Sequence, residues 1–264
     1  MRKIVMFSGG KDSSCLLHQM LFAGEDVEVV FCNTGWELPE TIEFIKGFIE
    51  QYHVKKFTEL QSEKFKSLPE LVQYKKYMPS PFMRFCTEEL KIKPLKAYVE
   101  SIDDEVHTYN GVRAEESTKR RKMLPEVYDD YIGAMMHRPL LYWTWEMVID
   151  YLKVNEVPIN PVYKNGMKRV GCGPCIMISL KEFAVFKELW PERIKIIAKL
   201  EEETGSYFFQ PDIVPERFRT ARGKGGELRS SIMDVVRYVD SKPKYYQYAE
   251  VAGESCMSYY NLCE

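Results

Sequence analysis

The sequence contains no run of about 18 apolar residues, the length that a membrane-spanning helix requires. Near its start, the apolar run at residues 4–7 is too short to form the core of a secretory signal peptide. We therefore expect no membrane segment and a cytoplasmic location.

The chain also has little net charge. Its 37 basic and 39 acidic residues give a formal net charge of −2. Such a balance argues against a protein that coats nucleic acids in general, but it leaves a local basic patch open. The basic, glycine-rich stretch at residues 217–229 is one candidate for such a patch, although a solvated loop explains it as well.

The sequence also lacks the even number of cysteines that a set of disulfide bonds would use. A disulfide framework is not expected from an odd number in a cytoplasmic chain of this size, so metal binding or thiol chemistry is favoured. The seven cysteines are Cys15, Cys32, Cys86, Cys172, Cys175, Cys256 and Cys263. The sequence also lacks the G-x-x-x-x-G-K-[ST] pattern of P-loop nucleotidases.

Short apolar segments alternate with amphipathic ones in the first half of the chain. Strands are predicted at residues 3–7, 27–32, 55–59 and 106–110, and helices at residues 12–23 and from Pro39 onward. This alternation predicts an α/β fold with a doubly wound, mostly parallel sheet. Ligands bind at the carboxyl ends of such strands, so the segments after Phe7, Cys32 and Asn110 should converge on one crevice.

The second half of the chain shows a different pattern of predicted elements. Helices are predicted at residues 143–153 and 179–204, the latter interrupted near Trp190 and Pro191, with a loop-rich segment between them. We expect a nucleotide-binding domain at residues 1–178. Residues 179–264 should form a mainly helical C-terminal region with a cysteine-bearing tail.

A glycine turn directly follows the first strand. Gly9 and Gly10 allow close backbone approach and positive φ, and the helix that starts near Asp12 points its positive end at the turn. Lys11 adds a positive charge, and Ser8, Ser13 and Ser14 add hydroxyl groups. An ordinary strand-to-helix turn would also contain glycines, but the added Lys-Asp-Ser-Ser favours a phosphate-binding loop.

Residues 8–13 resemble the pyrophosphate loop (PP-loop) of the adenine nucleotide α-hydrolase superfamily, which acts at the α-phosphate. Further segments resemble the phosphoadenosine phosphosulfate (PAPS) reductase family within it. Residues 33–41 resemble its D-T-G-x-x-x-P-E-T segment, with Asn33 in place of aspartate. Residues 84–95 resemble its C-C-x-x-x-K-x-x-P-L element, with Cys86 kept and Thr87 in place of the second cysteine.

Two more elements complete the resemblance, which runs in the family's order over residues 3–178. Residues 111–120 resemble its G-x-R-x-x-E-S-x-x-R element, and residues 139–163 resemble its P-L-x-x-W and P-x-N-P-L-Y stretch. The family's C-terminal E-C-G-L-H motif, which carries the reductase nucleophile, is missing. Lys11 and Asp12 follow the glycines as in the family's ATP-using members, which favours ATP over a sulfonucleotide.

The resemblance implies a set of functional residues. Arg113 and Arg120 would clamp phosphate or sulfate oxygens, although arginine and glutamate could instead pair on a solvated helix. The implied catalytic residues are Lys11, Asp12, Arg113 and Cys86. The implied nucleotide-binding residues are Ser8, Gly9, Gly10, Lys11, Asp12, Ser13, Ser14, Asn33, Thr34, Gly35, Glu37, Lys91, Gly111, Arg113 and Arg120.

Cys172 and Cys175 have the C-x-x-C spacing that lets two thiolates reach one metal ion or cluster. By the resemblance, Cys86 would join them around a [4Fe–4S] cluster, with Cys263 or Cys256 as fourth ligand or none. Zinc held by Cys172, Cys175, Cys256 and Cys263 is an alternative, and so is a reduced dithiol without metal.

The sequence thus predicts an enzyme that binds ATP, with Mg²⁺, and adenylylates an acceptor before an iron–sulfur or thiol centre transfers sulfur. The acceptor would be a nucleic acid or a small molecule. A separate sulfur donor would supply the sulfur. A sulfonucleotide reductase that forms sulfite with a thioredoxin-like reductant is the first alternative. A non-enzymatic nucleotide or redox sensor is the second.

Overall fold

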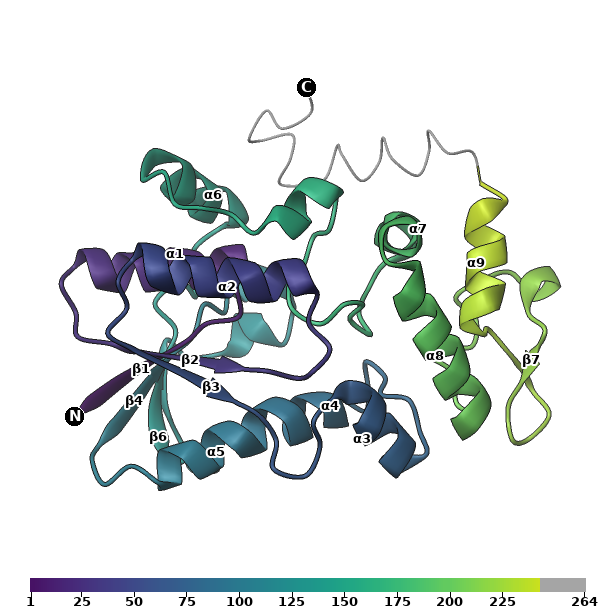
Figure 1. Ribbon diagram of the computed structural model, residues 1–264, viewed down its shortest axis with the longest axis horizontal. Coiled ribbons are helices and arrows are strands. Elements are labelled where there is room, and N and C mark those ends of the chain that lie inside the picture. Colours follow the sequence, from purple (N-terminus) through teal and green to yellow (C-terminus); the bar gives the residue numbers. More distant parts are fainter. Residues whose placement is uncertain (243–264) are drawn as a thin grey trace.

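The computed structural model describes residues 1–242, and Cys256 and Cys263 lie outside this range. Its centre is a six-stranded sheet in the order β3-β2-β1-β4-β6-β5 (Figure 1). The strands are β1 (Arg2–Met6), β2 (Glu28–Cys32), β3 (Lys56–Leu60), β4 (Val106–Tyr109), β5 (Glu126–Asp129) and β6 (Ala134–His137). The α/β fold with a mostly parallel sheet is confirmed, because only the β5–β6 pair is antiparallel.

Helices cover both faces of the sheet. One face carries α1 (Lys11–Phe22), α2 (Pro39–Gln51) and α6 (Trp145–Val154), and the other carries α5 (Lys93–Glu100) (Figure 1). Successive residues of β1 point to opposite faces of the sheet, which explains the two layers. Val5 packs in the core under α1, and Ile4 packs in the core under α5. Both side chains are fully buried.

The path of the chain determines where a ligand binds. From β1 the chain passes outward to β2 and β3, and then crosses back to β4 on the opposite side of β1. The order of the strands therefore reverses between β1 and β4. In open α/β sheets such a reversal leaves a crevice beyond the carboxyl ends of the two strands.

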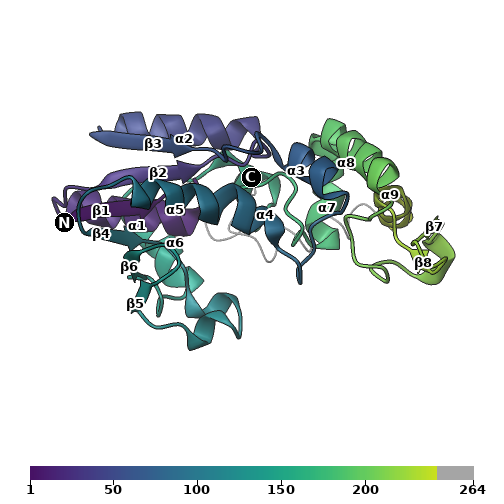
Figure 2. The same ribbon diagram turned by 90° about the horizontal axis from the view of Figure 1, so that it is seen from below.

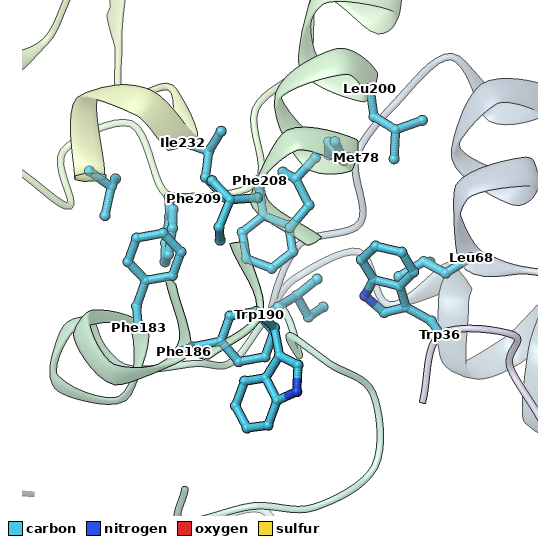
Figure 3. Packing of buried hydrophobic residues seen from close by; sticks show 14 of the residues in the cluster. Trp36, Leu68, Met78, Phe183, Phe186, Trp190, Leu200, Phe208, Phe209 and Ile232 are labelled. Carbon is cyan, nitrogen blue, oxygen red and sulfur yellow. The ribbon is translucent and has the colours of Figure 1, made fainter. Parts of the chain in front are cut away.

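A helical group lies beside the sheet. It contains α3 (Leu68–Lys75), α7 (Leu180–Leu189), α8 (Pro191–Thr204) and α9 (Ile232–Asp240), with the small hairpin of β7 (Ala221–Arg222) and β8 (Leu228–Arg229) (Figures 1 and 2). The predicted break at Trp190 and Pro191 is confirmed. Trp36 and Leu68 share one hydrophobic core with Phe183 (Figure 3), so residues from both halves of the chain pack together.

The remaining elements are short. They are α4 (Phe85–Thr87), the π-helix η1 (Glu88–Ile92), and the 3-10 helices η2 (Ala114–Glu116), η3 (Arg120–Lys122), η4 (Pro161–Asn165) and η5 (Glu216–Phe218). Within residues 1–242 no helix has both the length and the apolar character needed to cross a membrane.

Candidate nucleotide-binding site

A cavity of about 550 Å³ opens beyond the carboxyl ends of β1, β2 and β4. It lies at the predicted crevice, where the strand order reverses between β1 and β4. Its lining combines backbone, apolar and charged groups from the segments after β1, β2 and β4, from Lys91 and from residues 163–175. The lining residues used below are Ser8, Gly10, Lys11, Asp12, Ser13, Glu37, Lys91, Asn110, Gly111, Arg113, Glu116, Arg120, Tyr163, Lys168, Arg169, Cys172 and Cys175.

The glycine turn has the geometry of an anion-binding loop. Gly9 adopts φ of +71°, and a Cβ there would approach a side-chain carbon of Ile45 to 2.9 Å, so glycine fits both the turn and the packing. Gly10 caps α1 without a side-chain hydrogen bond, which leaves donors at the helix start pointing outward. The hydroxyl of Ser13 donates to the Gly10 carbonyl at 2.9 Å and closes the turn.

Tyr163 fastens this turn from a distant segment. The backbone N–H of Lys11 donates to the Tyr163 hydroxyl at 3.1 Å, and Lys11 Nζ lies 5.8 Å from the centre of the Tyr163 ring. Burial opposes the charge on Lys11, but Tyr163 and Asp12 outweigh it and raise the lysine pKa above its ordinary value. Lys11 is therefore a permanent cation beside the turn.

Asp12 and Arg113 join the loops that follow β1 and β4. The Asp12 carboxylate accepts from Arg113 Nε through one oxygen and from Lys11 Nζ, at 3.2 Å, through the other. The Arg113 side chain is 4% exposed and is also paired with Glu115. A Cβ on Gly111 would lie 2.9 Å from the Asp12 backbone, so glycine is needed where the two loops touch.

Positive charge dominates the cavity. Six cationic side chains line it, against the carboxylates of Asp12, Glu37 and Glu116. The six are Lys11, Lys91, Arg113, Arg120, Lys168 and Arg169. Arg120 is paired with Glu116, so the predicted pairing and the predicted clamp are both compatible with its position. Such a surface suits a ligand with several negative charges.

The segment after β2 reaches the cavity through one residue. Glu37 lines it, and its carboxylate accepts from the Thr34 hydroxyl at 2.8 Å and the Thr34 N–H at 3.0 Å. Asn33 instead donates to Glu59 and accepts from the Gly35 N–H, both at 2.7 Å. Asn33, Thr34 and Gly35 therefore shape the loop and are not among the residues that line the cavity.

Lys91 and the cysteine pair also line the cavity. The pKa of Lys91 is raised, mainly by Cys172 and against the effect of burial. Burial raises the pKa of the Cys172 thiol to about 11, although Lys91 opposes this. Both cysteines are free thiols, and the Cys172 sulfur lies 3.6 Å from the Thr34 hydroxyl.

Cys86 lies in α4, outside the cavity lining. Burial, followed by the charge of Cys175, raises the pKa of its thiol. No three His, Cys, Asp or Glu side chains of residues 1–242 are arranged to hold a metal ion. The predicted fourth ligand, Cys263, lies outside the described residues.

Most predicted site residues therefore converge. Those that line the cavity are Ser8, Gly10, Lys11, Asp12, Ser13, Glu37, Lys91, Gly111, Arg113, Arg120, Cys172 and Cys175. Gly9, Ser14, Asn33, Thr34, Gly35 and Cys86 are not in the lining. Sequence reasoning missed Tyr163, Lys168 and Arg169, whose only signal was their place between the P-x-N-P stretch and the C-x-x-C pair.

A sequence model described as "Phosphoadenosine phosphosulfate reductase domain" matches residues 2–178. An uncharacterized protein of Methanocaldococcus jannaschii is 34% identical over 187 residues, which is 70% of this chain and 44% of that protein. The chain thus matches less than half the length of that relative. An adenosine 5′-phosphosulfate reductase of Geobacillus kaustophilus is 29% identical over 154 residues, covering 57% of this chain and 62% of the enzyme.

The fold has a solved counterpart. A phosphoadenylyl-sulfate reductase from Candida auris, crystallised as a phosphate complex, superposes with a TM-score of 0.52 at 16% identity. The match covers 65% of this chain and 81% of that structure. At this identity the likeness concerns the fold.

Proposed function

The chain belongs to the phosphoadenosine phosphosulfate reductase domain family, and on this premise we propose that it is an enzyme that adenylylates an acceptor with ATP. An acceptor oxygen attacks the α-phosphorus, the bond to the β-phosphate bridge breaks, and pyrophosphate leaves. Members of the family act on adenine nucleotides, such as the adenosine 5′-phosphosulfate reductase relatives.

One arrangement carries this proposal: the start of α1, Lys11 and Arg113 face one cavity. The positive end of the helix, Lys11 and the buried Arg113 would stabilise the negative charge that grows on the departing pyrophosphate. Asp12 holds the two cations apart and in place, which fixes their geometry before the nucleotide arrives. The six cations of the lining outnumber its three carboxylates, which suits the triphosphate of ATP better than the less charged adenosine 5′-phosphosulfate.

Metals do not enter the proposed step. The Asp12 carboxylate is bound by two cations, and Glu37 is bound by its own loop, so neither is a ready ligand for Mg²⁺. Any Mg²⁺ would arrive with the ATP phosphates as part of the substrate. The described cysteines do not form the ligand set of an iron–sulfur cluster either, and we derive no step from one.

We propose that Cys172 and Cys175 act as a thiol centre for sulfur transfer. They line the same cavity as the glycine turn, so a sulfur atom carried there would meet an acceptor activated at the α-phosphate. Lys91 provides the positive charge that favours a thiolate, and at rest the raised pKa keeps Cys172 protonated. A donor persulfide would pass its outer sulfur to Cys172 and leave as a thiol. The Cys172 persulfide would then attack the adenylylated carbon of the acceptor, breaking its carbon–oxygen bond and releasing AMP. Cys175 would free the thiolated product by forming a disulfide with Cys172, and a thioredoxin-like dithiol would reduce that disulfide.

The alternative is a sulfonucleotide reductase. The identity to adenosine 5′-phosphosulfate reductases and the cysteine pair in the cavity support it. Such an enzyme would release sulfite and would not release pyrophosphate. A nucleotide sensor would bind ATP and release neither product.

The test uses the full chain purified without oxygen. ATP or adenosine 5′-phosphosulfate is added, with candidate acceptors, and pyrophosphate and sulfite are measured. We expect pyrophosphate from ATP, and a loss of about 100- to 1000-fold in Lys11→Ala, since removing one donor to a developing negative charge costs about 2.7–4 kcal/mol. Lys55→Ala is the matched control, because its side chain is 85% exposed. Sulfite without pyrophosphate would reverse the assignment in favour of the reductase.

A further inference from the structure

A second hollow adjoins the nucleotide cavity. It has a volume of about 420 Å³ and is lined by Arg84, Thr87, Glu88, Ile92, Lys119 and Tyr131. On one wall, Lys91 lines the cavity and its neighbour Ile92 lines the second hollow. On the opposite wall, Arg120 lines the cavity and Lys119 lines the hollow. The same two segments of the chain therefore contribute residues to both spaces.

A third hollow continues in the other direction. It has a volume of about 440 Å³, and it lies between the segment that precedes α4 and the β7–β8 hairpin. Met83 lines it, and the next residue, Arg84, lines the second hollow. Along the long axis of the molecule, α4 lies between the β5–β6 edge and the hairpin (Figures 1 and 2). The other residues that line the third hollow include Tyr77, Phe82, Tyr207, Gln210, Lys224 and Arg229.

Aromatic rings are exposed along this path. Phe82 is 90% exposed, and Tyr77 and Tyr131 are 43% and 48% exposed. Lys96 Nζ lies 4.7 Å from the Tyr131 ring centre and donates to the Tyr131 carbonyl, which holds this residue in place. Rings that are both exposed and fixed are suited to stack on flat ligands.

The same two hollows also carry positive charges. Arg84, Lys119 and Lys224 are exposed, and none has a carboxylate partner among residues 1–242. The two carboxylates of the path have cations of their own, since Glu88 lies 3.8 Å from Lys93 and Glu227 is paired with Arg229. The unpartnered charges on the path are thus positive.

We propose that this path binds a single-stranded nucleic acid and leads it to the nucleotide cavity as the acceptor of the adenylyl group. We call the path the strand track, defined by Tyr77, Phe82, Arg84, Lys119, Tyr131 and Lys224. The role of the nucleic acid as acceptor rests on the proposed function. Its binding rests on the residues of the track alone. Spaced cations match successive phosphates, and exposed rings match unpaired bases.

The chemistry favours single strands over other polyanions. A duplex hides the faces of its bases, so the exposed rings would be unused. An acidic peptide would use the cations and leave Phe82 without a partner. The predicted basic stretch contributes only in part, because Arg219 and Arg222 donate to the carbonyls of Val214 and Gly226.

Binding is measured by fluorescence anisotropy with the full chain and labelled oligo-dT or oligo-U of about 12 nucleotides, a typical length for such tracks. We expect Phe82→Ala and Tyr131→Ala to weaken binding roughly tenfold each. Arg84→Gln combined with Lys119→Gln should weaken it further and lower the slope of log affinity against log salt by about 1.4. The two oligonucleotides show whether DNA or RNA is preferred.

Tyr142→Ala and Lys55→Gln are matched controls, because both side chains are strongly exposed and lie outside the track. Melting temperatures check that each variant is folded. Equal affinity for a duplex of the same length, equal affinity for polyglutamate, or an equal loss in the controls would overturn the proposal. So would undetectable oligonucleotide binding by the unaltered chain.

The two proposals fail separately. Track-dependent binding without release of pyrophosphate from ATP would leave the binding surface and remove the adenylylation. Release of pyrophosphate without track-dependent binding would leave the reaction and remove the nucleic acid. Stimulation of pyrophosphate release by the oligonucleotide, lost in Phe82→Ala, is the result expected when both are right.

Discussion

Replacing Glu201 by glutamine tests how the C-terminal helices hold a buried carboxyl group. Glu201 lies in α8, where its two oxygens accept from the backbone N–H groups of Phe208 at 2.9 Å and Ile232 at 2.8 Å. Burial raises the pKa of Glu201 to about 7, the two N–H donors lower it, and nearby Asp234 raises it. The carboxyl group thus ties α8 to α9 and to the segment between them.

The sign of the pH dependence follows from this raised pKa. Below the ordinary value of 4.5, Glu201 is protonated in both states and costs nothing. Between pH 4.5 and about 7, the Glu201 carboxyl group ionises in the unfolded chain while it stays protonated in the folded one, so the folded state loses stability. At about 1.36 kcal/mol per pH unit, the loss between pH 4.5 and pH 8 is roughly 3 kcal/mol.

Urea unfolding at several pH values measures this loss. Glu201→Gln removes the titrating group but sets an amide N–H₂ against one backbone donor, so a constant penalty is expected at every pH. The diagnostic is the difference between variant and unaltered chain, which should move by about 3 kcal/mol in favour of the variant from pH 4.5 to 8. Glu202→Gln, on the exposed side of the same helix, is the control. A Glu201→Gln difference that does not change with pH would refute the reasoning.

Two further predictions concern the nucleotide site. Gly111→Ala should weaken ATP binding by roughly 5- to 150-fold in calorimetry, because its Cβ would press on the Asp12 backbone at the start of α1 and overpacking costs about 1–3 kcal/mol. Gly47→Ala, where a Cβ meets nothing within 4 Å, should leave binding unchanged. Metal analysis of the anaerobically purified chain should find no iron or zinc bound by the Cys172–Cys175 pair, and iron with sulfide that disappears in Cys172→Ser would show that the thiol centre is wrong.

The sequence was sufficient where one strong local signal decides the structure. Buried apolar strands next to glycines predicted β1, the turn at Gly9 and the start of α1 almost to the residue. The edge hairpin of β5 and β6 was missed because β5 is exposed along nearly all its length and has no alternating pattern. The hairpin of β7 and β8 was treated as a loop because each of its strands has two residues, too few to show a pattern.

The site was predictable to the extent that its residues lie within recognisable segments. Lys11 and Asp12 were found in the glycine turn after the first predicted strand, and Arg113 was found through the resemblance of residues 111–120 to a family element. Tyr163 was not assigned to the site, because its contact with the Lys11 N–H joins segments 152 residues apart and depends on tertiary structure. The division at residue 178 stays a prediction.

The helices beyond residue 178 nevertheless bear on the site. Arg193 of α8 donates to the Glu37 carbonyl at 2.8 Å, and its guanidinium lies 4.3 Å from the Trp36 ring centre. Trp36 is buried in the same core as Phe186 (Figure 3), and its indole N–H donates to the Pro174 carbonyl at 3.2 Å. The loop that presents Glu37 to the cavity is therefore held from both sides, by the C-terminal helices and by the cysteine-bearing segment. Through Arg193, the C-terminal helices therefore contact the loop that carries Glu37 into the nucleotide site.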